Sequence, residues 1–203
     1  MKLIEAVIFD WGGVLIEEPS GDLYRYCAKA LDVPIEQYIT AHKTYDDDFA
    51  TGKINEKEFW EKVCAELKKE MPQIKSLWYA AFEAAYKPRE DVFTLAVELD
   101  ANGYQTAVLS NTEPPSVQFF YKKGIDKFFD AAIFSCVEHT KKPERKIYDI
   151  AAGRLGLRAS QCVYIDDKIE FTKAAEAVGM KAILFKSFRQ IKSELENLGV
   201  RTE

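Results

Sequence analysis

The sequence predicts an α/β fold with a doubly wound parallel sheet and an inserted α-helical bundle after the first strand. Two observations support this prediction. Five short runs rich in Val, Ile, Phe and Ala alternate with helical patterns, which is typical of parallel strands buried on both faces. About 95 residues separate the first run from the second, far more than one crossover connection needs.

The five predicted strands are the apolar runs themselves. Because they are continuously apolar rather than alternating, we expect helices to cover both faces of the sheet. The predicted strands span residues 5–9, 105–110, 131–135, 162–166 and 181–185.

Three helices are predicted among the later strands. The first carries apolar residues at helical spacing from Val92 to Leu99 and ends at Asn102-Gly103. The second opens at Pro143 and places Ile147, Ile150, Ala151 and Leu155 on one face. The third covers residues 170–180 and joins the fourth strand to the fifth.

The long segment after the first strand is mostly helical in pattern. Four apolar stripes fall within residues 23–31, 35–49, 59–67 and 74–82, and Asn55 with Glu58 resembles a capping box before the third. Four short amphipathic helices would bury their stripes against one another. We therefore predict a core domain at 1–16 and 87–203 and a helical cap at 17–86.

Composition excludes several classes of function. The chain has 203 residues, a net charge of −5 and no basic stripe, so we expect no nucleic-acid partner. No apolar stretch is long enough to span a membrane, and the N-terminus lacks the pattern of a signal peptide. The four cysteines have wide, irregular spacing, so we expect buried thiols in a reduced, cytoplasmic protein.

Polar residues follow several of the predicted strands. Asp10 ends the first, Ser110-Asn111-Thr112 end the second, Asp166-Asp167 end the fourth, and Lys142 comes shortly after the third. The carboxyl ends of parallel strands form the ligand-binding edge of such a sheet. Three carboxylates, a hydroxyl and an ammonium group suit a hard cation together with a phosphate.

These segments carry a family resemblance. "FDWGGVL", "VLSNT", "KKPERKIY" and "VYIDDKIEFTKAAEAVGM" resemble, in order, the four motifs of the haloacid dehalogenase-like (HAD) hydrolases. The chain is most similar to the helical-cap branch, which includes sugar-phosphate phosphatases of the glucose-1-phosphate phosphatase type. The resemblance spans residues 4–185. It implies a Rossmann-like core and hydrolysis of a phosphate ester through a covalent intermediate.

The resemblance also implies roles for single residues. Asp10 would be the nucleophile that forms an aspartyl-phosphate. Ser110, supported by Asn111, would bind the transferring phosphoryl group. Lys142 would neutralise the developing charge, contact the substrate and orient Asp10.

A Mg²⁺ cofactor is implied as well. Asp10, the backbone carbonyl of Gly12, and Asp167 would hold the ion, with Asp166 assisting. Gly12 and Gly13 would let the backbone turn tightly and approach the substrate.

The sequence departs from the family pattern at two positions. Most phosphatases of the family carry a second aspartate where this chain has Gly12, and loss of a general acid costs roughly 10²–10⁴-fold in rate. A good leaving group, an acid from the cap or from Glu17 or Glu18, or poor turnover would each account for this. At the other position Phe171 replaces an Asp or Asn near the metal, and the adjacent Glu170 is a candidate substitute.

We predict a Mg²⁺-dependent phosphatase that acts on a small phosphorylated metabolite, with sugar phosphates among the candidates. Two alternatives stay open: a 2-haloacid dehalogenase, which needs no second acid, and a non-catalytic metabolite-binding protein. The phosphatase is preferred over the dehalogenase because two adjacent buried acids, Asp166 and Asp167, would repel each other without a cation. Tyr45 and Phe49 are candidates for shaping the substrate pocket from the cap, and the oligomeric state stays open.

Overall fold

The centre of the molecule is a five-stranded parallel sheet, seen in a computed structural model that describes residues 4–203. The strand order is β3-β2-β1-β4-β5, so the winding reverses direction between β1 and β4. All five predicted strands are confirmed to within a residue at each end. Their bounds are β1 Ala6–Phe9, β2 Gln105–Ser110, β3 Ala131–Phe134, β4 Cys162–Asp166 and β5 Lys181–Leu184.

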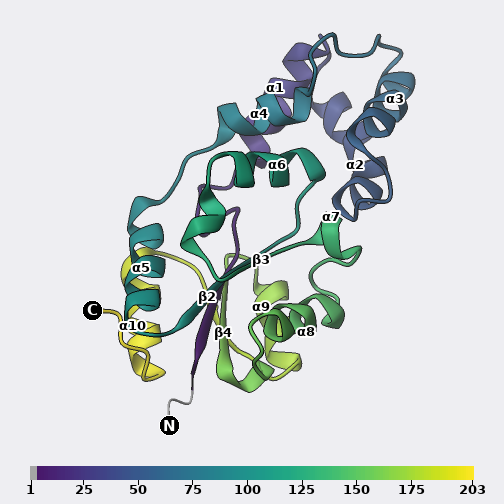
Figure 1. The fold of residues 1–203 in the computed structure, drawn as a ribbon. Coiled ribbons are helices and arrows are strands. Elements are labelled where there is room, and N and C mark those ends of the chain that lie inside the picture. Colours follow the sequence, from purple (N-terminus) through teal and green to yellow (C-terminus); the bar gives the residue numbers. More distant parts are fainter. Residues whose placement is uncertain (1–3) are drawn as a thin grey trace.

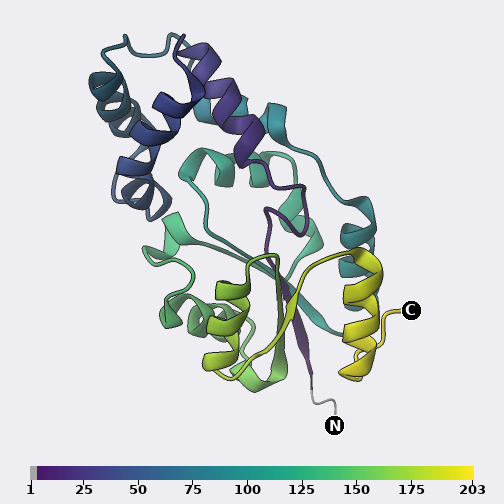
Figure 2. The same ribbon diagram turned by 180° about the vertical axis from the view of Figure 1, so that it is seen from behind.

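Helices cover both faces of this sheet, as expected for continuously apolar strands (Figures 1 and 2). Val7 and Phe9 of β1 pack on one face with α5, α6 and α10, whereas Ala6 and Ile8 pack on the other with α8 and α9. The doubly wound α/β fold is therefore confirmed. The bounds of these helices are α5 Glu90–Ala101, α6 Pro114–Lys122, α8 Arg145–Arg154, α9 Ile169–Ala177 and α10 Phe188–Asn197.

Four helices between β1 and α5 gather above the carboxyl edge of the sheet (Figure 1). The capping box before α3 is present: Glu58 N donates to the Asn55 side chain, and Asn55 N donates to the Glu58 carboxylate. Residues 17–86 stay our proposed cap. The helices are α1 Ser20–Ala30, α2 Ile35–Ala50, α3 Glu56–Leu67 and α4 Leu77–Ala85.

The two segments that enter and leave these four helices run side by side. Glu17 N donates to Lys87 O at 2.9 Å, and Arg89 N donates to Leu15 O at 2.9 Å. The helices also touch the core further out, because the Ser135 hydroxyl of α7 (Ser135–Glu138) donates to Ala50 O at 2.6 Å. In the structure the four helices therefore lie closed over the carboxyl edge.

Some elements differ from the sequence-based expectation. Helix α6 was not predicted, and neither were α7, α10 and two 3-10 turns at Ile125–Phe128 and Ala159–Gln161. Helix α8 begins at Arg145 rather than at Pro143, whose bond to Lys142 is cis. No helix in the described part of the chain combines the length and the apolar character that crossing a membrane requires.

Candidate active site

The acidic residue at the end of β1 lies beside the end of β4. Phe9 pairs with Ile165 in register, and Asp10 N donates to Ile165 O at 2.8 Å. This register brings Asp10 next to Asp166, as the sequence predicted for the carboxyl edge. Both carboxylates are almost fully buried.

Lys142 connects the two acids. Its Nζ lies 2.8 Å from Asp10 Oδ1 and 2.8 Å from Asp166 Oδ2, and it donates to the Tyr164 hydroxyl at 2.8 Å. The ammonium also sits 4.8 Å from the centre of the Phe171 ring. With 2% of its surface exposed, Lys142 is held in one position by two charges and an aromatic face.

Asn111 fixes the backbone that presents Lys142. Its side-chain amide donates to Lys142 O at 2.9 Å, and Lys142 N donates back to Asn111 Oδ1 at 2.8 Å. Asn111 therefore joins the end of β2 to the lysine loop. Ser110 precedes it with a buried hydroxyl that lines the same cavity as Asp10.

Burial sets the ionisation of these groups. It raises the pKa of Asp10 to about 8, although Lys142 pulls in the other direction. Burial, reinforced by Asp166, also raises the pKa of Asp167. Burial alone would lower the pKa of Lys142, but Asp10 and Asp166 together raise it. Three acids around one ammonium form a site that favours an additional positive charge.

The same acids fit a divalent cation. Asp10, Asp166 and Asp167 each place a carboxylate oxygen within 4.8 Å of the others. Asp167 Oδ1 is buried and accepts no hydrogen bond in the described part of the chain, so this oxygen is available to coordinate a cation. Both oxygens of Asp166 already accept hydrogen bonds, from Lys142 and Tyr164 on one side and from Lys168 N on the other. Asp10 and Asp167 are therefore the better-placed ligands.

Phe171 has a different role from the acid or amide that the family usually carries there. Its ring packs beneath the ammonium of Lys142, and its backbone oxygen accepts a hydrogen bond from Tyr148. Glu170 is exposed on α9 and is not part of the acidic group. The candidate cation site thus consists of the three aspartates without a substitute from α9.

Gly13 makes room for Asp167, and this gives a first testable prediction. The glycine has φ +90°, and a Cβ there would lie 2.3 Å from Asp167 Oδ2. We expect Gly13→Ala to cost at least about 1–3 kcal/mol of stability. By displacing Asp167, it should also disturb the candidate cation site, so we expect Mg²⁺ to raise the melting temperature of the wild type and to raise that of this variant less.

A matched control for this prediction is Gly153→Ala. Gly153 lies within α8, and a Cβ there would meet nothing within 4 Å. Alanine is the better helix former, so this variant should gain about 0.5–1 kcal/mol and keep its response to Mg²⁺. Thermal unfolding with and without Mg²⁺ measures both variants. Equal Mg²⁺ shifts in Gly13→Ala and the wild type would contradict the prediction.

A cavity of about 130 Å³ opens beside Asp10. Of the predicted site residues, it is lined by Asp10, Gly12, Ser110, Asn111 and Lys142, whereas Gly13, Asp166 and Asp167 are not among its lining residues. The cavity therefore lies directly over the candidate nucleophile and lysine.

The sequence missed the cap residues that reach this cavity. Tyr45 and Phe49 do not line it, and Phe49 instead stacks on Phe59 inside the cap. The lining residues come from α1 and α4, the cap helices closest in sequence to the two connecting segments. They are Ser20, Leu23, Tyr24, Trp78 and Phe82.

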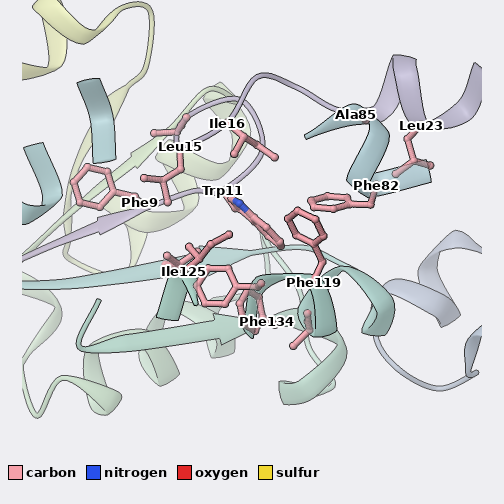
Figure 3. Close-up of a cluster of buried hydrophobic side chains, with 14 of the residues drawn as sticks. Phe9, Trp11, Leu15, Ile16, Leu23, Phe82, Ala85, Phe119, Ile125 and Phe134 are labelled. Carbon is pink, nitrogen blue, oxygen red and sulfur yellow. The ribbon is translucent and has the colours of Figure 1, made fainter. Parts of the chain in front are cut away.

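Trp11 forms the wall where the core meets the cap. Its ring packs 4.9 Å from Phe82 of α4 and 5.2 Å from Phe120 of α6, measured between ring centres. Figure 3 shows Trp11 pointing from the end of β1 towards Phe82 and Phe119. The residue that follows the candidate nucleophile therefore both packs in the core and lines the cavity.

A parallel α/β core with a buried aspartate, a paired lysine and two further acids at its carboxyl edge is typical of a hydrolase. The haloacid dehalogenase-like hydrolase family matches residues 4–179, and the chain belongs to that family. The family motifs expected from the sequence are thereby confirmed as a group.

Two curated relatives are similar along most of this chain. Acyl-CoA dehydrogenase family member 10 of Mus musculus is 29% identical over 202 residues, which cover 95% of this chain and 19% of the mouse protein. A sesquiterpene phosphatase of Aspergillus oryzae is 25% identical over 178 residues, covering 87% of each protein. This chain thus spans about a fifth of the mouse relative and most of the fungal one.

Solved structures share the fold. A HAD-like family hydrolase from Porphyromonas gingivalis superposes with a TM-score of 0.80 at 23% identity, covering 96% of this chain and 98% of that one. A HAD family enzyme from Bacteroides thetaiotaomicron, in complex with magnesium and inorganic phosphate, gives 0.72 at 20% identity, with coverages of 90% and 94%. L-2-haloacid dehalogenase from Xanthobacter autotrophicus gives 0.62 at 18% identity, with coverages of 98% and 84%.

Proposed function

We propose that this protein is a Mg²⁺-dependent phosphatase that hydrolyses a small phosphorylated metabolite through an aspartyl-phosphate on Asp10. The observation that carries the proposal is the meeting of Asp10, Lys142 and the buried, unpartnered Asp167 oxygen at one strand edge. The fungal phosphatase relative and the magnesium and phosphate in the Bacteroides structure support the same reaction class.

In this proposal each residue has a separate role in the reaction. Asp10 attacks phosphorus, Lys142 holds Asp10 in line and neutralises charge on the phosphoryl group, and Ser110 binds a phosphoryl oxygen. Asp10, the Gly12 carbonyl, Asp167 and Asp166 would hold Mg²⁺, which supplies charge neutralisation at the phosphoryl group when bound. The closed cap keeps bulk water from the intermediate and selects small substrates.

The cavity explains why the substrate should be small. It lies between the carboxyl edge of the sheet and helices α1 and α4, which limits the leaving group that fits beneath the cap. We propose metabolite phosphates, sugar phosphates among them, as the substrate class. The cytoplasmic setting belongs to the same proposal and is supported by four buried, unpaired cysteines.

The test is phosphate release from p-nitrophenyl phosphate. The purified protein should release phosphate with Mg²⁺, and removal of the metal by EDTA should lower the rate by at least about 10²-fold, with recovery on adding Mg²⁺ back. Activity that is unaffected by EDTA would contradict the proposed cofactor. Metal-independent chloride release from 2-chloropropionate would instead support the dehalogenase alternative, which the Xanthobacter neighbour keeps open.

A further inference from the structure

Glu113 is an acidic residue in the cavity that the family motifs do not include. It follows Ser110-Asn111-Thr112 directly and stands at the N-cap position of α6. It lines the same 130 Å³ cavity as Asp10 and Gly12, and it receives a hydrogen bond of 3.5 Å from the Thr112 hydroxyl. A leaving group held in this cavity would therefore share it with Glu113.

The surroundings of Glu113 favour its protonated form. Burial raises its pKa to about 8, and Asp46 of α2 adds to that rise. Glu113 also interacts electrostatically with Tyr24 of α1, Tyr38 of α2 and Cys136 of α7. The pKa of each of these two phenols and one thiol is raised, so all three are neutral near pH 7. At neutral pH, Glu113 therefore offers a carboxyl proton to the cavity.

We infer, resting on the proposed phosphatase function, that Glu113 is the general acid and base that this chain lacks at Gly12. It enters the cavity from the end of β2 rather than from the end of β1. The general acid would thus come from the segment after β2 instead of the segment after β1.

The proposed steps balance in atoms and charge. As an Asp10 oxygen forms its bond to phosphorus, the ester oxygen leaves with the electrons of the breaking P–O bond and takes the proton of Glu113. This gives the free alcohol, an aspartyl-phosphate and a Glu113 carboxylate. A water molecule then gives a proton to Glu113 while its oxygen bonds to phosphorus, and the bond between phosphorus and the Asp10 oxygen breaks with its electrons returning to the carboxylate. This releases inorganic phosphate and regenerates both side chains.

The sequence suggested two other acids, Glu17 and Glu18, for this role. Glu17 is exposed and lies 3.9 Å from the ammonium of Lys87. Glu18 lines the cavity, and its Oε1 accepts hydrogen bonds from the backbone and the hydroxyl of Ser20, at 3.1 and 2.5 Å. Glu18 thus stabilises the start of α1. Its Oε2 lies 3.9 Å from where a Cβ on Gly12 would be, so Glu18 is the competing candidate.

Leaving-group dependence tests the inference. p-Nitrophenolate leaves with little need for a proton, whereas the alkoxide of 2-phenylethyl phosphate needs one. Glu113→Gln should lower kcat/KM for 2-phenylethyl phosphate by about 10²-fold more than for p-nitrophenyl phosphate. Glu113→Asp, which keeps the acid, should recover part of that loss. Glu83→Gln, at a half-exposed surface glutamate paired with Lys123, is the matched control and should change neither rate.

The pH profile supplies a second readout. Since the acid must be protonated, the wild-type pH profile of kcat/KM for 2-phenylethyl phosphate should have a falling alkaline limb that Glu113→Gln lacks, whereas the rise from ionisation of Asp10 should be common to both proteins. Equal losses on both esters, no loss on either, or a selective loss in Glu18→Gln would overturn the inference. If the wild type and Asp10→Asn are equally inert on p-nitrophenyl phosphate, the proposed function itself fails.

Discussion

Asp10→Asn should abolish phosphate release from p-nitrophenyl phosphate, lowering kcat by about 10⁴-fold or more. The amide keeps the size of the side chain and can still accept the 2.7 Å hydrogen bond from Trp11 N. It has no anionic oxygen to attack phosphorus, however, and it weakens the cation site. The fold should therefore persist while the covalent step is lost.

Steady-state phosphate release with Mg²⁺ measures this effect, and circular dichroism checks the fold. Asp149→Asn is the matched control, because Asp149 is a half-exposed aspartate on α8 that pairs with Arg145. It should retain the wild-type rate. If Asp10→Asn kept more than about a tenth of that rate, Asp10 would not be the nucleophile.

Lys142→Met should reduce the free energy of unfolding by about 3–5 kcal/mol near pH 8. The substitution leaves Asp10 and Asp166 buried without the ammonium that lies 2.8 Å from each. The pKa of Asp10 is already raised, so the penalty grows as the pH rises through about 8, where this carboxyl ionises. The loss of stability should therefore shrink as the pH falls towards 5.

Urea denaturation at several pH values measures the change, and the neighbouring lysine provides the control. Lys141 pairs with Asp47 at the surface, so Lys141→Met should cost only about 0–1 kcal/mol. The comparison also tests which of the two adjacent lysines belongs to the site. Equal costs for both variants would contradict the assignment of Lys142.

The strands and their polar ends could be predicted because burial on both faces leaves an unmistakable apolar run. Each run stops where a carboxylate or hydroxyl begins, and parallel register then brings Asp10 beside Asp166. Helix α6 was missed because Pro114-Pro115 looks like a turn, although proline is well tolerated in the first turn of a helix. Helix α8 starts after Pro143 because the backbone of Lys142 is held by the Asn111 side chain.

The cap side of the site could not be predicted for a different reason. Which stripe residues of α1 and α4 face the cavity depends on how the helices dock on the core, and their periodicity reports only that they are buried. Leu23 and Trp78 therefore look the same in sequence as Phe49. Glu113 follows the predicted Ser110-Asn111-Thr112 segment directly, but its significance depends on the nearby Asp46, which is distant in sequence.

Trp78, one of the residues that line the cavity, gives the protein an intrinsic fluorescent probe of cap movement. The indole of Trp78 on α4 lines the cavity and donates to the Ser116 hydroxyl of α6 at 3.1 Å, so it bridges the boundary that a substrate must separate. Trp11 and Trp60 can be replaced by phenylalanine to leave this single indole. Its emission should then shift to longer wavelength when the bridge to Ser116 breaks and water reaches the ring, which gives a label-free record of each opening.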